Sequence, residues 1–317
     1  MWRLHAPGWS CIGRRVWAKV TVGRNRTPKD VSVMREAQIL HSESAAKFWF
    51  RDHTRLKPSF IVIGAMRSGT TSLYRYLCQH PWVASANYKE LHFFDHQYFP
   101  EAVKWYARQF PSRFARMENK TANRFRMITG EASPSYLLHP LAPQRAAKHL
   151  PAAKLVAVLR NPVDRAFSHY QHGRRWGYEP LSFEEAIKQE SSRIQPEREK
   201  LVSGEVNTSD PFMWFSYCAR GCYMDRLEEW LQHYPKEKLL IIISEELYAD
   251  PNSSMRRLTD FLGLPPMVTR APDDFEKHNL NQYQGMNAAT RKELLAFFRP
   301  HNQRLAKFLG RELPWDV

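Results

Sequence analysis

The chain has 317 residues, of which 43% are hydrophobic and 25% are charged, and this composition excludes an intrinsically disordered protein. Its formal net charge of +15 predicts an anionic partner, such as a nucleotide, an acidic polysaccharide, nucleic acid or a membrane surface, unless it only reflects a cationic solvated surface. Four cysteines are too few for a disulfide scaffold in a chain of this length. Cys218 and Cys222 are therefore expected to be thiols in a packed segment, with a local disulfide as the alternative.

Residues 1–57 are expected to form a basic N-terminal arm and a helix, and residues 58–317 the main domain. The arm holds twelve Lys or Arg and four Asp or Glu, which suits contact with a membrane or polyanion as well as a leader without function. The sequence contains no uncharged apolar run near the ~20 residues that cross a bilayer, and no signal peptide is recognised. A cytoplasmic location without a transmembrane segment is predicted. Four Asn-x-Ser/Thr sequons leave the secretory pathway, including the Golgi lumen, as the alternative.

Residues 59–77 predict a strand, a glycine loop and a helix. The apolar run 60–63 is rich in β-branched residues and too short for a helix, so it reads as a buried strand. Gly64 and Gly69 bracket a loop of small and polar residues, and apolar residues then recur at helical spacing. This order directs backbone N–H groups and a helix N-terminus at one point, which favours a bound phosphate or sulfate. A tight turn without a ligand is the alternative.

The glycine spacing is close to that of a nucleotide-triphosphate P-loop, in which Lys follows the second glycine. Here Thr70 stands at that position, and Arg67 is the only cation in the loop. The loop therefore suits a different phosphorylated donor, bound by hydroxyls, amides and one guanidinium group.

The stretch Gly-Ala-Met-Arg-Ser-Gly-Thr-Thr-Ser-Leu resembles the 5′-phosphosulfate loop of sulfotransferases that use 3′-phosphoadenosine 5′-phosphosulfate (PAPS). The resemblance implies that PAPS is the donor and 3′-phosphoadenosine 5′-phosphate (PAP) the product. A sulfuryl group carries less charge than a phosphoryl group, so no metal is expected to be required. Those enzymes usually have Lys at the position of Arg67, and an Arg can donate hydrogen bonds but does not readily act as a general acid. The loop residues that the resemblance assigns to the donor are Arg67, Ser68, Gly69, Thr70, Thr71 and Ser72. Arg67 is also expected to be catalytic, because with Thr70 and Thr71 it would stabilise the phosphosulfate.

The segment Lys-Glu-Leu-His-Phe-Phe-Asp begins at Lys89. A carboxylate and an imidazole against apolar surface can have pKa values tuned for proton transfer, although an exposed charged turn before a buried Phe pair would look the same. The segment is similar to the Lys-Glu-x-His-Phe-Phe-Asp segment of glycosaminoglycan sulfotransferases of the heparan sulfate 3-O type. The resemblance implies that Glu90 is the catalytic base, that His92 is its neighbour or substitute, and that Lys89 faces the donor or the acceptor.

A helix is expected within 101–110 and a short strand over 127–129, followed by Glu131. The following residues resemble a Glu-x-(Thr/Ser)-Pro-x-Tyr segment that lines the active cleft in the family. Glu131 is interpreted as either structural or a partner of Arg67.

The apolar run 155–159 predicts a strand of a parallel sheet that is covered on both faces. Arg160 follows directly, where ligands of such sheets bind, although a core strand with a salt-bridged Arg would look similar. The stretch Leu-Arg-Asn-Pro-Val-Asp-Arg-Ala-Phe-Ser-His-Tyr resembles the 3′-phosphate-binding element of PAPS sulfotransferases. The resemblance implies that Arg160 and Ser168 hold the nucleotide 3′-phosphate.

Arg174 and Arg175, next to a tryptophan, form a basic cluster suited to an anionic sugar. The remaining predicted elements are a charged helix over 182–200, a helix that starts near 220–223, a strand over 239–243, a helix over 252–262 that ends at Gly263, and a last helix over 287–309. Pro300 is expected to kink or break the last helix. Lys277 and His278 precede it, in a loop that in the family often folds over the nucleotide.

These patterns predict an α/β fold: a single P-loop-like domain with a central, mostly parallel sheet and helices on both faces. The predicted function is in-line transfer of a sulfuryl group from PAPS to a hydroxyl or amine, with a carbohydrate such as a glycosaminoglycan-like polysaccharide as the favoured acceptor and no nucleic acid partner. No oligomeric state is predicted. A P-loop kinase or NTPase is the first alternative, disfavoured by Thr70. A non-catalytic polyanion-binding protein is the second alternative, and it assigns no role to Glu90.

Overall fold

The computed structural model describes residues 54–96, 98, 102–112, 127–266 and 285–315. The predicted N-terminal arm with its helix, the sequons at Asn25 and Asn119, and the loop with Lys277 and His278 lie outside these residues. The division into an arm over 1–57 and a domain over 58–317 therefore stays a prediction. No helix of the described ranges is long and apolar enough to cross a membrane.

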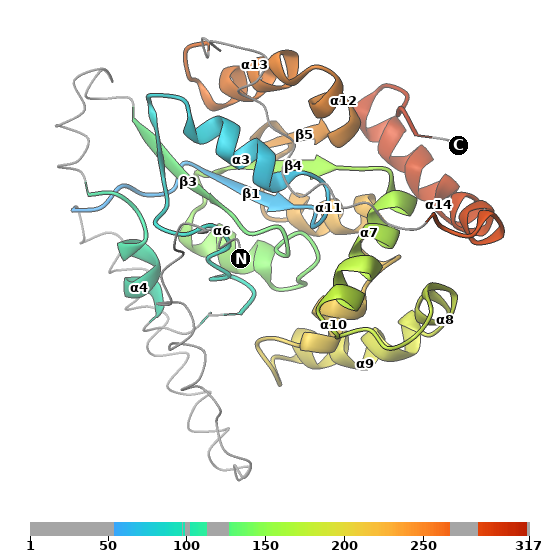
Figure 1. Ribbon diagram of the computed structural model, residues 1–317. Helices are drawn as coiled ribbons and strands as arrows, with labels where there is room; N and C mark the ends of the chain where they lie inside the picture. The colour runs from blue at the N-terminus through green and yellow to red at the C-terminus, as the bar shows by residue number, and fades with distance from the viewer. Residues whose placement is uncertain (1–53, 97, 99–101, 113–126, 267–284, 316–317) are drawn as a thin grey trace, which may run out of the picture. The chain divides into compact units, whose positions relative to one another are not determined.

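Five parallel strands form one sheet in the order β2-β3-β1-β4-β5. The strands are β1 (Phe60–Gly64), β2 (Val83–Ser85), β3 (Ile128–Ala132), β4 (Lys154–Leu159) and β5 (Leu239–Ile243). The first strand in the chain thus lies at the centre of the sheet, between two strands that follow much later (Figure 1). This arrangement confirms the predicted α/β fold with a parallel sheet.

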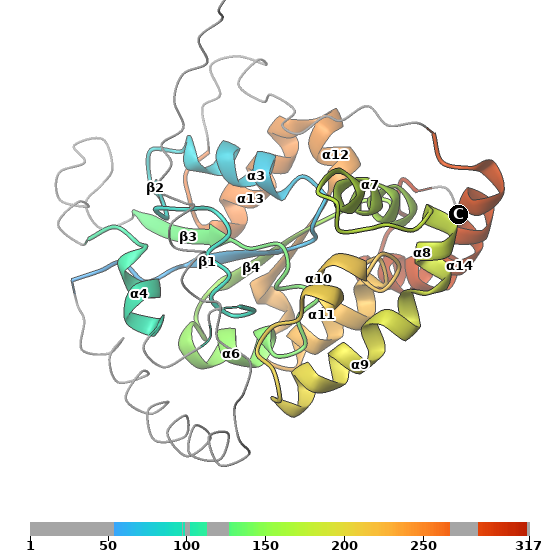
Figure 2. The ribbon, with the colours of Figure 1, turned by 60° about the horizontal axis from the view of Figure 1, so that its bottom comes forward.

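Helices cover both faces of the sheet (Figure 2). On one face lie α3 (Thr70–Cys78), α12 (Ser244–Ala249) and α13 (Pro251–Leu262), and on the other α4 (Ala102–Arg108), α6 (Ala142–His149) and α11 (Tyr223–Leu231). Because side chains alternate along a strand, Val62 packs with the first set and Ile61 with the second. Burial on both sides explains why these strands read as continuous apolar runs.

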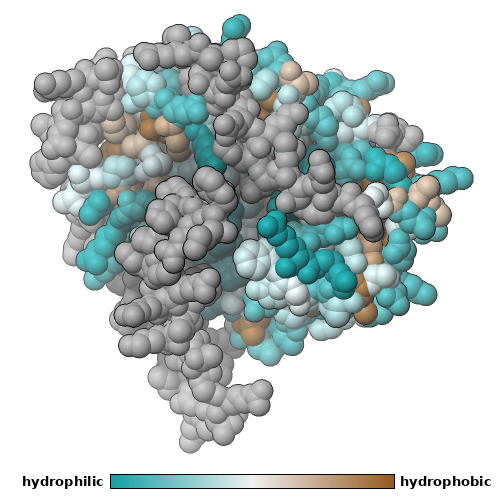
Figure 3. Space-filling view, in the orientation of Figure 1, coloured by the Kyte–Doolittle hydropathy of each residue, from teal (hydrophilic) through white to brown (hydrophobic). Residues whose placement is uncertain are grey.

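A further helical layer follows the carboxyl end of β4. It contains α7 (Pro162–Arg175), α8 (Phe183–Lys188), α9 (Glu190–Ser203), α10 (Asp210–Phe215) and α14 (Ala288–Leu309), and η1 (Lys236–Lys238) is a short 3-10 helix before β5. Val163 of α7 and Phe298 of α14 share one apolar cluster with Tyr217. The described surface in the view of Figure 3 is mainly hydrophilic, with hydrophobic residues in small separate areas.

Two helix predictions were wrong in part. The single charged helix expected over 182–200 is two helices, because Ser182 forms a capping box that starts α8 and a second helix begins after Gln189. The last helix does not break at Pro300, since α14 continues through it to Leu309. Pro300 is exposed, so water can bind the backbone carbonyl that loses its helical hydrogen bond there.

The cysteines of the described residues are thiols. Cys78, Cys218 and Cys222 are free, which confirms the thiol prediction over the local disulfide. The sulfur of Cys222 instead donates to the carbonyl of Cys218, four residues earlier, at 3.6 Å.

Candidate active site

The carboxyl ends of all five strands meet at one edge of the sheet, because the strands are parallel. The glycine loop follows β1, the segment with Ser133 and Ser135 follows β3, and Arg160 follows β4. Sequence positions about ninety residues apart are thereby brought to a common edge.

The two predicted phosphate-binding elements contact each other. Arg67 Nε donates a hydrogen bond to Ser168 Oγ at 3.1 Å, and Arg160 Nη1 reaches the carbonyl oxygen of Arg67 at 3.5 Å. One cationic cradle, formed by Arg67, Arg160 and Ser168, therefore combines the groups that the sequence assigned to opposite ends of the donor.

The glycine loop has the geometry of an anion site. Gly69 has a φ of +96° and precedes α3, and a Cβ at this position would lie 2.9 Å from the hydroxyl of Tyr248. The first N–H groups of α3, which include those of Thr70 and Thr71, have no acceptor within the helix and can bind an anion. The Ser72 hydroxyl lies 3.3 Å from that of Tyr248, and Ser68 of the loop is fully buried.

The second half of the cradle is fixed by its neighbours. The Arg160 carbonyl accepts a 2.7 Å hydrogen bond from the Tyr223 hydroxyl, and Glu245 accepts one from the backbone N–H of Asn161 at 2.9 Å. Asn161 in turn caps α7 by accepting from Val163 N at 3.0 Å. Arg160 is therefore held at the start of α7, the helix that carries Ser168.

The loop after β2 carries Glu90 and His92 in strained backbone conformations. Their φ angles are +62° and +52°, in the left-handed region that is uncommon for residues other than Gly. The N–H of Glu90 donates to Ala132 O at 3.0 Å, which ties the loop to the end of β3. Such strain persists only where surrounding contacts hold it, and it often occurs at functional sites.

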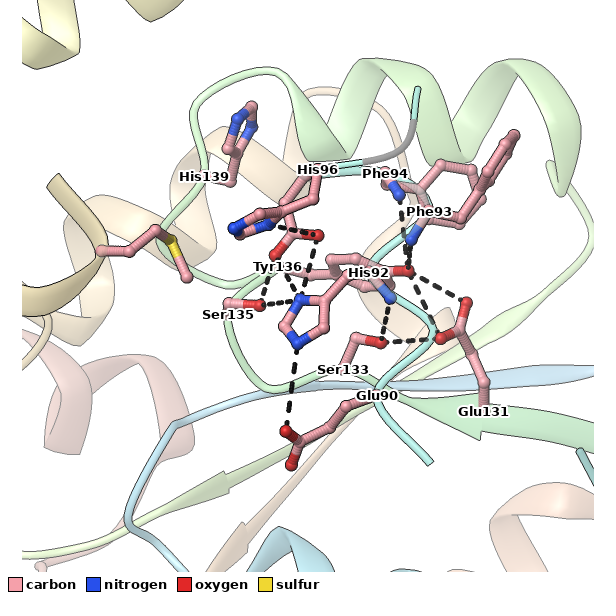
Figure 4. A network of polar contacts seen from close by, with 12 residues as sticks. Glu90, His92, Phe93, Phe94, His96, Glu131, Ser133, Ser135, Tyr136 and His139 are labelled. Carbon is pink, nitrogen blue, oxygen red and sulfur yellow. Dashed lines mark hydrogen bonds and ion pairs between the residues drawn. The ribbon is translucent and has the colours of Figure 1, made fainter. Parts of the chain in front are cut away.

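A chain of polar contacts runs from Asp95 through His92 to Glu90. His92 Nδ1 lies 3.1 Å from Asp95 Oδ2, and His92 Nε2 lies 3.9 Å from Glu90 Oε2 (Figure 4). Ser135 donates to the fully buried Asp95, and Lys89 forms an ion pair with Glu90. Asp95 and Ser135 were not among the predicted site residues, although Asp95 ends the Lys-Glu-Leu-His-Phe-Phe-Asp segment that carried the prediction.

These contacts determine the charges of the site. Burial would lower the pKa of His92, but the charge and hydrogen bond of Asp95, followed by those of Glu90, raise it to about 10. Burial likewise opposes ionisation of Glu90, but His92 and Lys89 lower its pKa to about 2. At neutral pH Glu90 is thus a carboxylate that can accept a proton, whereas His92 is an imidazolium that donates.

The predicted acceptor-binding arginines differ in their surroundings. Arg174 Nη1 donates to the carbonyls of Glu179 and Pro180, both at 3.0 Å, and so holds the loop after α7. Arg175 is exposed in the last turn of α7.

Four aromatic rings cluster near the end of α7, with Tyr178 and Trp176 exposed and Trp214 and His172 half-buried. Tyr178 stacks on Trp214 with ring centroids 4.1 Å apart, and His172 stacks on Trp214 at 5.7 Å. Trp176 is 64% exposed and meets His172 edge-on at 6.3 Å. We call Trp214, Tyr178, His172 and Trp176 the aromatic platform. No spacing in the sequence indicated Trp214 and Tyr178, because their contact joins α10 to the loop after α7.

The charges of the site act on His172 of the aromatic platform. Burial and then the charge of Arg67 lower the pKa of His172, while the charge of Glu90 raises it. His172 is therefore within electrostatic range of both the cradle and the predicted base.

Among the described residues, two clusters each bring three candidate metal-ligand atoms within 4.8 Å of one another. The first cluster is His92, Asp95 and His96, and the second is Cys222, Asp225 and His301. In the first, hydrogen bonds already engage both Asp95 oxygens. In the second, Arg304 lies 2.5 Å from Asp225, and a bound cation would repel it. The expectation that no metal is required stays a prediction.

Residues 57–313 match the family described as "Sulfotransferase domain". The chain is 29% identical to the membrane-associated sulfotransferase kil1 of Dictyostelium discoideum, over 82% of this chain and 66% of the relative. It is 30% identical to the bifunctional heparan sulfate N-deacetylase/N-sulfotransferase 2 of Homo sapiens, over 83% of this chain and 31% of that protein. The heparan sulfate glucosamine 3-O-sulfotransferase 3A1 of Mus musculus is also 30% identical, over 82% and 64%.

The chain thus spans about a third to two thirds of the length of these relatives. Among solved structures, a sulfotransferase from Alicyclobacillus acidocaldarius superimposes with a TM-score of 0.59 at 33% sequence identity. That comparison covers 81% of this chain and 97% of the bacterial one.

Proposed function

Because the chain belongs to the sulfotransferase family, we propose that it transfers a sulfuryl group from PAPS to a hydroxyl or amine of a carbohydrate acceptor. The observation that carries this proposal is the contact between the two phosphate-binding elements, in which Arg67 binds Ser168 and Arg160 reaches Arg67. A donor with phosphate groups at both its 3′ and 5′ positions suits a cradle with two guanidinium groups.

The transfer step needs three contributions from the chain. The acceptor oxygen attacks sulfur while the bond from sulfur to the 5′-phosphate oxygen breaks, and the acceptor proton passes to a carboxylate oxygen of Glu90. Arg67 and the N–H groups of α3 stabilise the charge that develops on the leaving phosphate. His92, held by Asp95, forms an ion pair with Glu90 and orients it.

Lys89 links donor binding to the base. It pairs with Glu90 in this structure, and its charge is one cause of the low pKa of Glu90. The negative charge of a bound donor attracts the same ammonium group. Donor binding is therefore expected to weaken the Lys89–Glu90 pair and raise the pKa of Glu90, which makes Glu90 a stronger base when the sulfuryl group is in place.

A carbohydrate acceptor is supported by the aromatic platform next to Arg175. Aromatic rings present flat apolar faces to the C–H groups of sugar rings, and neighbouring cations suit carboxylate or sulfate substituents. The net charge of +15 and the names of the heparan sulfate relatives agree with an anionic sugar.

Replacing Trp214 tests the acceptor site. Trp214→Ala removes the ring on which Tyr178 and His172 stack, and we expect the KM for a glycan acceptor to rise about tenfold, roughly the value of one lost aromatic contact. The affinity for PAP, measured by calorimetry, should change less than twofold. Trp105→Ala, which removes an exposed Trp of α4, is the matched control. An unchanged KM in Trp214→Ala would reject the platform as an acceptor site.

Radiolabelled PAPS incubated with a panel of acidic glycans, neutral glycans, lipids and phenols tests the function as a whole. Label transfer to glycans that persists in a chelator supports the proposal and the absence of a required metal. Transfer only to lipids or phenols rejects the acceptor class. Failure to transfer to any acceptor, together with magnesium-dependent ATP hydrolysis, would instead favour the kinase or NTPase alternative.

The compartment stays a prediction, cytoplasmic with the Golgi lumen as the alternative. Of the sequons in the described residues, Asn252 is exposed, whereas the side-chain oxygen of Asn207 accepts a 3.1 Å hydrogen bond from Arg145. A glycan attached to Asn252 in the native protein would establish the secretory alternative.

A further inference from the structure

We propose that Glu131 is a positioning residue of the transfer reaction, and that its buried carboxyl group holds the loop that carries Glu90 and His92. The inference rests on the proposed function, since it assigns that loop to catalysis. The sequence left Glu131 as either a structural residue or a partner of Arg67, and its contacts in the structure favour the structural interpretation.

Glu131 is the centre of a buried cluster of hydroxyl groups. It lies on β3 with none of its surface exposed. Its carboxyl oxygens accept hydrogen bonds from Tyr106 at 2.5 Å, from Ser133 at 2.8 Å and from Tyr136 at 3.2 and 3.3 Å. These donors come from α4 and from the segment that follows β3, so the carboxyl group joins two parts of the fold.

Two of these hydroxyls also bind the catalytic loop. Ser133 Oγ accepts from the backbone N–H of His92 at 3.2 Å, and the Tyr136 hydroxyl accepts from Phe93 N at 2.9 Å and from Phe94 N at 3.4 Å. Three consecutive N–H groups of the loop are thus held by hydroxyls that also form hydrogen bonds to Glu131 (Figure 4).

The carboxyl group determines the direction of these hydrogen bonds. A hydroxyl has one proton and two acceptor lone pairs, so Ser133 and Tyr136 can accept from the loop only while they donate elsewhere. An ionised carboxylate has no proton to donate, so it accepts a hydrogen bond from each of the two hydroxyls. Glu131 therefore fixes both hydroxyls as acceptors toward the loop, which an apolar residue of the same size would not do.

This anchoring acts where the backbone is strained. His92 has a φ of +52°, and its N–H is bound directly by Ser133. The same residue contacts Asp95 on one side and Glu90 on the other. If the loop relaxes, the His92 ring leaves this position and Glu90 loses its orientation. Burial raises the pKa of Glu131 to about 7 against its hydrogen bonds, so the carboxylate that accepts from all three hydroxyls predominates above that pH.

Glu131→Gln tests the proposal, because it keeps the shape of the side chain but replaces an acceptor by an NH₂ donor. We expect kcat for label transfer to fall at least tenfold, while the Kd for PAP stays within twofold. Amide hydrogen exchange in the 90–96 peptide should accelerate, and exchange in β4 should not change. Thr129→Val is the matched control, since it removes another buried side-chain hydrogen bond of β3, to Ala84 O, that does not involve residues 92–94.

Two milder variants keep the test informative if Glu131→Gln does not fold. Tyr136→Phe removes the hydroxyl that links Glu131 to Phe93 and Phe94, and Ser133→Ala removes the one that links it to His92, while Glu131 itself stays in place. Each variant should lower kcat with PAP affinity retained. Because Glu131 acts through these hydroxyls, Glu131→Gln combined with Tyr136→Phe should lower kcat less than the product of the two single effects.

The proposal is overturned if kcat in Tyr136→Phe and Ser133→Ala stays within twofold of the wild type, or if exchange in β4 accelerates as much as in the 90–96 peptide. The exchange measurement needs no acceptor. If no acceptor is ever sulfated, faster exchange confined to 90–96 still supports the anchor, so a failure of the proposed function and a failure of this inference are distinguishable.

Discussion

Glu90→Gln is expected to lower kcat for sulfuryl transfer by about 10²- to 10⁴-fold, the usual contribution of a positioned general base. The amide cannot take the acceptor proton, although it occupies nearly the same volume. The donor cradle is formed by Arg67, Arg160 and Ser168, so the Kd for PAP should stay within about twofold. Label transfer under saturating substrates gives kcat, and calorimetry gives the Kd.

The comparison needs a variant with the same chemical change outside the site. Glu237→Gln removes an exposed carboxylate in η1 and should leave both constants unchanged. If Glu90→Gln retains its turnover, Glu90 is not the general base. PAP affinity lost together with turnover would place Glu90 in donor binding instead.

Arg160→Met is expected to weaken PAP binding about 10- to 100-fold, which corresponds to the loss of charged hydrogen bonds worth about 1.5–3 kcal/mol. The decisive measurement compares PAP with AMP, which lacks the 3′-phosphate. The wild type should prefer PAP, and Arg160→Met should lose most of that preference while it binds AMP almost normally.

Arg299→Met provides the matched control for Arg160→Met. It removes one positive charge from an exposed position of α14, and therefore reports the general effect of charge on a chain with a net charge of +15. Equal weakening of PAP and AMP binding in Arg160→Met would contradict a 3′-phosphate contact.

The strands with continuous apolar runs could be predicted from sequence almost to the residue. The expected strand over 239–243 is β5 (Leu239–Ile243), and the helix predicted to end at Gly263 does so, with Gly263 at a φ of +76°. The strand β2 was missed because it has three residues and a single buried one, Val83. The helices α6 and α10 were also missed, since helices of eight and six residues carry little periodic signal.

The site could be predicted where several functional side chains lie in one short segment of the sequence. The glycine loop and the segment from Lys89 to Asp95 each carry several functional residue types close together. The contacts of Ser135 with Asp95 and of Trp214 with Tyr178 join residues 40 and 36 positions apart, as their numbers show. No local pattern reports such pairs, because the fold alone brings them together.

The central position of β1 in the sheet affects how the chain folds during translation. Both neighbours of β1 are synthesised long after it, β3 from Ile128 and β4 from Lys154 onward. Until they emerge, the apolar strand has no partners to cover its edges or faces. We therefore expect the nascent chain to expose this segment to chaperones over about one hundred residues of translation, and the donor cradle to form only after α7 has left the exit tunnel.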